Sequence, residues 1–268
     1  MEKLFYLDVN TTERPNNDHF MLHVHDNYEI FMFIEGDAKY VVEENVHNLE
    51  PFDVIIIRKN QLHRIYHNST KKYKRMIINI SPRFFEENNC PEYERQFNSP
   101  PLISMGNKIS GKAVKSSGLY DAFMRLLKYR DESEDDESPV VKASITEILY
   151  IINNIKYDYE SSTDNPQLKE VIEYINENFT GDVSLSELEK RFFISKYHLC
   201  RIFQKATGLT VHQYITKKRL AFSNEMMKSG KNINDVAESA GFNNYSSFYR
   251  AYVNEFGKKP KDEKKRLH

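Results

Sequence analysis

In this chain of 268 residues, the side chains best suited to metal or ligand binding are the polar ones of HVHDNYE, residues 23–29. His23 and His25 are one residue apart, and Glu29 follows four positions later. A further histidine, His63, lies farther along the chain. Imidazole and carboxylate groups suit borderline divalent metals, so the set has the composition of a metal site. The same polar groups can also bind a small molecule directly.

The elements around these residues are predicted to be β-strands. Several short segments are rich in β-branched and aromatic residues and are separated by turn residues. They are Ile30–Ile34, Ala38–Val42, Asp53–Ile57 and Arg75–Ile80. Short strands at nearly even spacing are typical of a sandwich or barrel. If residues 23–29 are also extended, alternation places His23, His25, Asn27 and Glu29 on one face.

The pattern changes to helical after Gly118. Apolar residues recur at helical spacing over 119–127 and again over 140–152, which predicts two helices. Residues 159–166, YESSTDNP, have the composition of a linker. We therefore predict a domain boundary in this stretch.

Everything from residue 167 onward is predicted to be helical, with a degenerate internal repeat. The copies span 185–208 and 233–257. Each has a short helix, a turn of a few residues, and a longer helix with apolar residues on one side and an arginine on the other. This is the helix-turn-helix arrangement.

The longer helices have the composition of DNA recognition helices. Ser195 and Asn244 are predicted N-caps, and Phe248 and Tyr252 are predicted to face inward. Arginine can read guanine, and Asn or Ser can contact base edges or phosphates in a major groove. The predicted DNA-contacting residues are Ser195, Lys196, Tyr197, Arg201, Gln204, Asn244, Tyr245, Ser247 and Arg250.

The charge distribution agrees with a polyanionic partner for the last part of the chain. Residues 167–268 hold 18 Lys and Arg against 12 Asp and Glu, a net charge of +6. Residues 1–166 hold 20 against 27, a net charge of −7. A basic patch is the electrostatic footprint of a nucleic-acid-binding domain.

Residues 167–268 resemble the double helix-turn-helix domain of the AraC/XylS family of bacterial transcription regulators. The family signature of the second motif is met by Ala237, Gly241, Phe242, Asn244, Ser246, Phe248, Arg250, Gly257 and Pro260. Three positions depart from it. Val253 stands where the family usually has Lys, and Lys259 replaces Ser or Thr. Glu189 stands where the first motif usually has a small Ala, which predicts altered packing there.

The first part of the chain resembles the cupin barrel, a fold that sensor domains of AraC-type regulators share. The match includes Gly36 and Pro51, whereas Phe52 replaces a glycine of the second cupin motif. The resemblance implies a small-molecule effector, often a sugar, with His23, His25, Tyr28, Glu29 and His63 as its contacts. The counterparts of His23, His25, Glu29 and His63 bind metal in metal-binding cupins. A third interpretation is that these histidines have no ligand role.

Other function classes are disfavoured by what the sequence lacks. No apolar run reaches the roughly 18 residues of a bilayer span, and the N-terminal stretch has no signal-peptide layout. The two cysteines, Cys90 and Cys200, lie far apart in sequence and fit a reducing cytosol. We find no nucleophile elbow, P-loop or dinucleotide fingerprint. We therefore expect a cytoplasmic protein that is not an enzyme, has no catalytic residues and requires no cofactor.

The sequence thus predicts an α+β multidomain protein with a cupin-like barrel, following helices and an all-α double helix-turn-helix domain. The predicted parts are 1–105 (effector-sensing barrel), 106–158 (helical dimerisation region), 159–166 (linker) and 167–268 (DNA-binding domain). Expected partners are double-stranded DNA, a small-molecule effector of the sugar class, a second copy of the chain and, for an activator, RNA polymerase; no membrane is expected. The alternatives are a metal-binding cupin sensor or enzyme fused to a DNA-binding module, and an effector-independent regulator.

Overall fold

The computed structural model describes residues 3–20, 22–43, 45–97, 107–133, 135, 137–155, 166–207, 209–228, 231–257 and 259–261. The chain separates into two compact units. The first consists of residues 1–21, 27–59 and 64–162, and the second of residues 22–26, 60–63 and 163–268. The first unit is rich in strands and the C-terminal part is helical, so the expected α+β class is confirmed.

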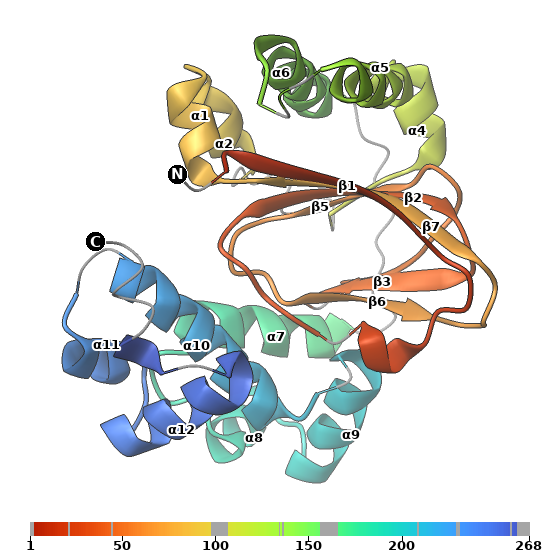
Figure 1. Cartoon of the computed structure of the whole chain (residues 1–268). Coiled ribbons are helices and arrows are strands. Elements are labelled where there is room, and N and C mark those ends of the chain that lie inside the picture. The colour runs from red at the N-terminus through yellow and green to blue at the C-terminus, as the bar shows by residue number, and fades with distance from the viewer. Residues whose placement is uncertain are drawn as a thin grey trace. The chain divides into compact units, whose positions relative to one another are not determined.

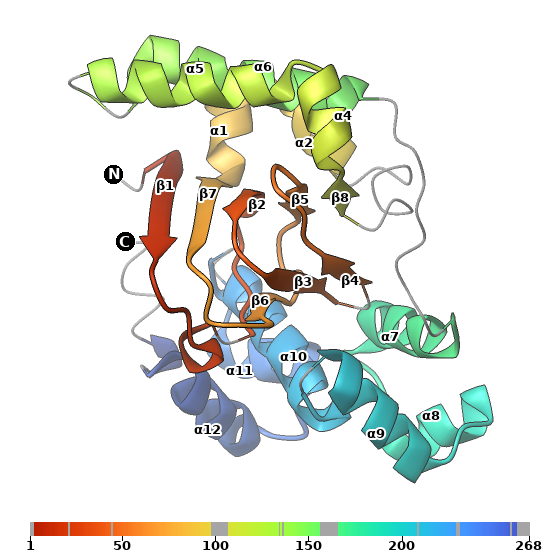
Figure 2. The same ribbon diagram turned by 90° about the vertical axis from the view of Figure 1, so that its right-hand side faces the viewer.

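Two β-sheets face each other in the first unit (Figure 1). The larger has the strand order β1-β7-β2-β5-β8, which Figure 2 shows from left to right, and the smaller has the order β4-β3-β6. The strands are β1 (Phe5–Thr12), β2 (Tyr28–Glu35), β3 (Ala38–Val42), β4 (Asn45–Asn48), β5 (Val54–Ile57), β6 (His63–His67), β7 (Tyr73–Ile80) and β8 (Lys108–Ile109). A 3-10 turn, η1 (Asn17–His19), follows β1.

Both faces of the larger sheet are buried, which explains why its central strands are nearly continuous apolar runs. On β2, Ile30 and Met32 belong to the cluster that contains the helical residues of this unit. Phe31 and Phe33 belong to a second cluster, formed with residues of the smaller sheet such as Tyr40. Successive β2 residues therefore point alternately toward the helices and toward the space between the sheets.

Helices cover the outer face of the larger sheet (Figure 1). They are α1 (Pro82–Glu87), α2 (Pro91–Phe97), α4 (Gly111–Ser116), α5 (Leu119–Glu132) and α6 (Pro139–Asn154). The apolar residues predicted to share a helix face, such as Phe123 of α5 and Ile148 of α6, are fully buried. Among the helices that the structure describes, none combines the length and the hydropathy that a bilayer span requires.

The expectation that residues 23–27 belong to the same strand as Glu29 was wrong. Strand β2 begins only at Tyr28, and His23 instead forms an isolated antiparallel bridge with His63. His25 and Asn27 lie outside any strand. The alternation rule therefore does not apply to this segment, and any proximity of its side chains has another cause.

Three further differences concern the predicted boundaries. Helices α1 and α2 lie within the range 1–105 that was predicted as barrel, and β8 pairs with β5 beyond the end of that range. The predicted linker, 159–166, lies outside the described residues except for Pro166, where α7 begins. These elements are short, which makes them hard to recognise from periodicity.

Six helices form the described C-terminal part of the second unit. They are α7 (Pro166–Asn178), α8 (Leu185–Phe192), α9 (Lys196–Thr207), α10 (Val211–Lys228), α11 (Ile233–Ser239) and α12 (Tyr245–Phe256). The pairs α8–α9 and α11–α12 are the two predicted helix-turn-helix motifs. One buried cluster contains residues of α7 to α10 together with Leu22 and Leu62, and another contains residues of α10 to α12. The long helix α10 thus contributes to both cores.

The turn between α7 and α8 connects the two motifs. From α10, Arg219 donates Nε–H to the carbonyl of Phe179 at 2.7 Å and Nη2–H to the carbonyl of Gly181 at 2.9 Å. At Gly241, between α11 and α12, an added Cβ would lie 2.4 Å from the carbonyl oxygen of Thr180. Residues 179–181 therefore contact both α10 and the turn of the second motif.

Candidate functional site

The first candidate DNA-binding helix is α9, and its N-terminus is capped as predicted. The hydroxyl oxygen of Ser195 accepts a hydrogen bond from the backbone N–H of His198 at 3.3 Å. Leu199 and Phe203 are fully buried, which fixes the inner face of the helix. The residues predicted to contact DNA from this motif are all exposed: Ser195, Lys196, Tyr197, Arg201 and Gln204.

Glu189 has a specific role in this motif. Its carboxylate accepts a hydrogen bond from the backbone N–H of Lys196 at 3.2 Å and lies 3.6 Å from the Nζ of the same residue. Glu189 is only partly buried, so the large side chain at this position extends toward the start of α9. In the same helix Arg201 donates to His198 Nδ1 at 3.3 Å. Two predicted DNA-contacting cations thus have local partners.

The second candidate DNA-binding helix is α12. Asn244 is its N-cap, and its side-chain oxygen accepts from the Ser247 backbone N–H at 2.8 Å. Phe248 and Tyr252 are fully buried, as predicted from their spacing. Arg250 is exposed on the other side of the helix. The remaining predicted contacts, Tyr245 and Ser247, are partly exposed.

The basic triplet of α10 has structural contacts. Lys217 forms an ion pair with Glu255, and the Nζ of Lys218 lies 5.9 Å from the centre of the Phe179 ring. Arg219 bonds to the turn between α7 and α8, as described above. The basic residues of this domain therefore differ in role, because those of α10 make contacts within the domain.

A polar group lies between the two sheets of the first unit. Glu29 is buried and accepts a hydrogen bond from the hydroxyl of Tyr40 at 3.1 Å. Tyr73 and His67 are also buried, and their ring centres are 4.5 Å apart. The ring of Phe20 contacts both, with centre distances of 4.6 Å to His67 and 5.8 Å to Tyr73.

Tyr40, Tyr73 and His67 are neutral hydrogen-bonding groups at neutral pH. Burial and, to a smaller extent, the positive charge of Arg75 together lower the pKa of His67 from 6.5 to about 4. Burial also raises the pKa values of Tyr40 and Tyr73 far above their usual value. Within the described part of the chain, the Tyr73 hydroxyl and the His67 Nε2 have no hydrogen-bond partner.

Tyr28 does not lie with these residues. Because it is adjacent to Glu29 on β2, it points to the opposite face of the sheet. Its ring packs against Phe85 and Phe97, with centre distances of 5.4 and 4.9 Å, and its hydroxyl donates to Glu94 at 3.0 Å. The structure therefore places Tyr28 among the helices and Glu29 between the sheets.

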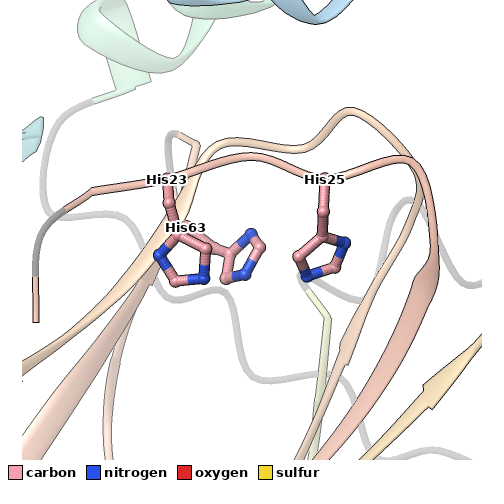
Figure 3. Close-up of side chains that lie close together, drawn as sticks. All are labelled: His23, His25 and His63. Carbon is pink, nitrogen blue, oxygen red and sulfur yellow. The ribbon is translucent and has the colours of Figure 1, made fainter. Parts of the chain in front are cut away.

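The other three predicted site residues come together in the second unit. The side chains of His23, His25 and His63 point toward one another (Figure 3). One ring nitrogen of each lies within 4.8 Å of the others, so the three have the donor type and spacing to hold a metal ion. Glu29, which was predicted with them, is not part of this group.

Sequence reasoning missed His67 and Tyr73 as candidate ligand contacts. Strand alternation gives a partial signal, because Ile65 and His67 of β6 share one face. Which face of β6 and β7 lies between the sheets depends on long-range pairing, for example of Tyr73 with Thr12 of β1. No local sequence pattern predicts that pairing.

Similarity to known proteins agrees with both units. An AraC-like ligand-binding domain model matches residues 11–139, and a helix-turn-helix domain model matches residues 188–266. The HTH-type transcriptional activator RhaS of Mannheimia succiniciproducens is 25% identical over 257 residues, which cover 93% of this chain and 91% of that protein. The Msm operon regulatory protein of Streptococcus mutans is 20% identical over 250 residues, covering 91% and 86%. The structure of ToxT from Vibrio cholerae covers 99% of this chain and 98% of its own, at 14% identity and a TM-score of 0.40.

A ligand-binding domain joined to a helix-turn-helix domain defines a DNA-binding transcription regulator. The chain belongs to the AraC family of transcriptional regulators. The resemblance seen in the sequence is thereby confirmed. The family consists of regulators and not of enzymes, so the expectation that this chain is not an enzyme is confirmed as well.

Proposed function

We propose that this AraC-family regulator responds to a sugar bound between the two sheets of its first unit. The observation that carries the proposal is the pair of buried polar atoms, Tyr73 Oη and His67 Nε2, which lack a hydrogen-bond partner in the described part of the chain. More than about nine in ten buried polar groups have a partner, from protein, water or ligand. A polar molecule in this space would supply one.

The chemistry of the surrounding groups favours an uncharged polyhydroxyl ligand. A tyrosine hydroxyl both donates and accepts, and neutral histidine offers one donor and one acceptor. The carboxyl group of Glu29 can accept from sugar hydroxyls, as it already does from Tyr40. The rings of Phe20 and Phe33 lie against Tyr73 and supply apolar surface. Ligand sites commonly combine such apolar walls with a few placed polar groups.

The test is calorimetric titration of the purified chain with a panel of mono- and disaccharides. Removing the hydroxyl in Tyr73→Phe should weaken binding of the best sugar about fivefold, since one hydrogen bond is worth about 1 kcal/mol. Tyr66→Phe is the matched control, because Tyr66 is 39% exposed. Equal affinities of wild type and Tyr73→Phe would refute the assignment. If no sugar binds the wild type, an effector-independent regulator is favoured.

The proposal includes binding of two DNA half-sites by a homodimer. The DNA contacts are the nine residues predicted from α9, α12 and their caps. The assignment is supported by the exposure of seven of them and the partial exposure of Tyr245 and Ser247. Sugar binding would change DNA occupancy only if the sugar binds the DNA-bound and free arrangements with different affinity. A regulator of this kind acts where bacterial DNA is, in the cytoplasm, and as an activator it would contact RNA polymerase.

Dimerisation is proposed through the outer faces of α5 and α6. Val140 and Tyr150 of α6 are 42% and 56% exposed although both are large apolar or aromatic residues. Sedimentation at micromolar concentration should show a dimer, and Tyr150→Asp should shift it toward monomer. Tyr6→Asp is the control, since Tyr6 of β1 is 57% exposed and lies on another element. A monomeric wild type would exclude this interface.

A further inference from the structure

We propose that His23, His25 and His63 bind a divalent transition-metal ion of the zinc type. The ring centre of His63 lies 4.2 Å from that of His23 and 4.8 Å from that of His25. Nitrogen ligands of one tetrahedral ion at about 2.0–2.1 Å lie roughly 3.3 Å apart. Small side-chain rotations therefore suffice to close the observed separations, which reach 4.8 Å, around an ion.

The backbone holds the three residues in place before any ion arrives. His23 and His63 exchange two hydrogen bonds, with N···O distances of 3.1 Å and 3.0 Å. The carbonyl of His25 accepts from the backbone N–H of Asn60 at 2.9 Å. The two chain segments are thus joined on either side of the cluster. A site built on such paired backbone loses less conformational entropy on binding than a site on unconnected loops.

A second polar contact orients the ring of His63 and indicates which of its nitrogens donates. Its Nδ1 lies 2.8 Å from the carbonyl oxygen of Gln61, which can only accept. Nδ1 therefore carries the proton as donor, and Nε2 carries the lone pair. Metal-binding histidines almost always donate their other ring N–H to such a partner, which orients the ring and raises its basicity. His63 thus shows the arrangement of a metal ligand.

The composition of the cluster selects the class of ion. Three neutral imidazoles suit Zn, Cu, Ni or Fe, whereas Mg²⁺ and Ca²⁺ prefer oxygen ligands. The carboxyl group of Glu29, which cupin resemblance would add, is not part of the group. Three protein ligands leave a fourth position for water. The ion would therefore join the segments 22–26 and 60–63, to which all three ligands belong.

The site can be tested by titrating the EDTA-treated and dialysed full chain with Zn²⁺. We expect one ion per chain and no binding of Mg²⁺. Loss of one histidine should weaken Zn²⁺ binding by about a hundredfold or more, because loss of even an outer-shell partner costs 10–100-fold. His23→Ala is the variant of choice because His23 is exposed, so its removal leaves the core intact. His212→Ala, at an exposed histidine of α10, is the control and should bind as the wild type.

A second measurement separates metal binding from folding. Because the ion binds the native state, Zn²⁺ should raise the midpoint of thermal unfolding of the wild type and of His212→Ala but not of His23→Ala. All three should unfold alike in EDTA. Wild-type binding no tighter than that of His23→Ala would overturn the proposal. The result is independent of the sugar site, which is tested at Tyr73.

Discussion

The two helix-turn-helix motifs build the same turn in different ways. In the first, α8 ends at Phe192, and its C-cap residue Phe193 adopts a left-handed conformation with φ 53° and is 93% exposed. In the second, the turn passes through Gly241, whose φ is +87° and whose backbone packs against Thr180. The first turn is thus open to solvent, and the second is closed against another part of the domain.

The starts of the two longer helices differ as well. At the N-terminus of α9, the Ser195 hydroxyl accepts from the backbone N–H of His198. The Glu189 carboxylate accepts from the backbone N–H of Lys196. At the N-terminus of α12, among the hydrogen bonds described, only the Asn244 side chain accepts from a backbone N–H, that of Ser247, at 2.8 Å. The turn and helix start of the first motif thus have more exposed polar contacts, whereas the turn of the second is packed against Thr180. Substitutions in the second motif should therefore be the more damaging.

The largest effect is expected for Gly241→Ala. The new methyl group would meet the Thr180 carbonyl oxygen at 2.4 Å and would strain a left-handed backbone, so we expect a loss of about 3 kcal/mol in unfolding free energy. Gly257→Ala is the matched control. Gly257 also has positive φ, +65°, but an added Cβ meets nothing within 4 Å, so about 1 kcal/mol is expected. Equal losses in urea denaturation would show that the Thr180 contact is unimportant.

The next effect is on DNA binding. Arg250→Ala and Arg201→Ala should each weaken specific binding by about 1–3 kcal/mol if the arginines contact guanine. The loss should be smaller for Arg201, because DNA must replace its bond to His198. Fluorescence anisotropy with a selected operator at fixed salt measures both, and Lys205→Ala in the last turn of α9 is the control. Unchanged affinity of both arginine variants would contradict their placement at the DNA.

A smaller effect is expected at the caps. Ser195→Ala and Asn244→Ala each remove a side-chain acceptor at a helix N-terminus, which typically costs about 1 kcal/mol. Because α9 keeps the Glu189 carboxylate, the loss should be smaller for Ser195→Ala than for Asn244→Ala. Adding Glu189→Ala to Ser195→Ala should remove the difference. A loss for Ser195→Ala as large as that for Asn244→Ala would show that Glu189 gives no support.

The smallest effect is a gain. Phe193→Gly should stabilise the chain by about 0.5–1 kcal/mol, because glycine adopts the left-handed conformation without the cost that other residues bear. The ring contributes little burial, since Phe193 is 93% exposed. Phe192→Gly, one residue earlier and helical, is the control and should destabilise. A lower thermal midpoint for Phe193→Gly would mean that the ring has a contact in the folded domain.

Local chemistry explains which features were predictable from the sequence. Short-range patterns predict the caps at Ser195 and Asn244. They also predict the buried pair Phe248 and Tyr252 and the core of β2. The proximity of His23 and His63 does not, because it depends on a bridge between segments 40 positions apart. Alternation along one strand was expected to group His23 with His25 and Glu29, and only the cupin resemblance added His63; the structure brings the three histidines together through the bridge instead.

Phe52 is a second position at which the sequence predicts only part of the structure. It stands where the cupin motif has glycine, and the structure gives it the left-handed conformation that glycine favours, with φ 74°. Its ring packs at 5.1 Å from the ring of Tyr120, counted between centres. The sequence shows the missing glycine, but the packing that accompanies the replacement requires the position of α5.

The contacts of residues 179–181 have a consequence for the operator. Arg219 and Gly241 both lie against this turn, so we expect α9 and α12, the two candidate DNA-binding helices, to keep one separation and one relative rotation. Inserting a single base pair between the two DNA segments read by one chain turns the second by about 34–36° around the duplex axis. A domain that holds its two helices fixed cannot contact both segments after that rotation. We therefore expect the spacing within each half-site to be invariant even where its bases vary.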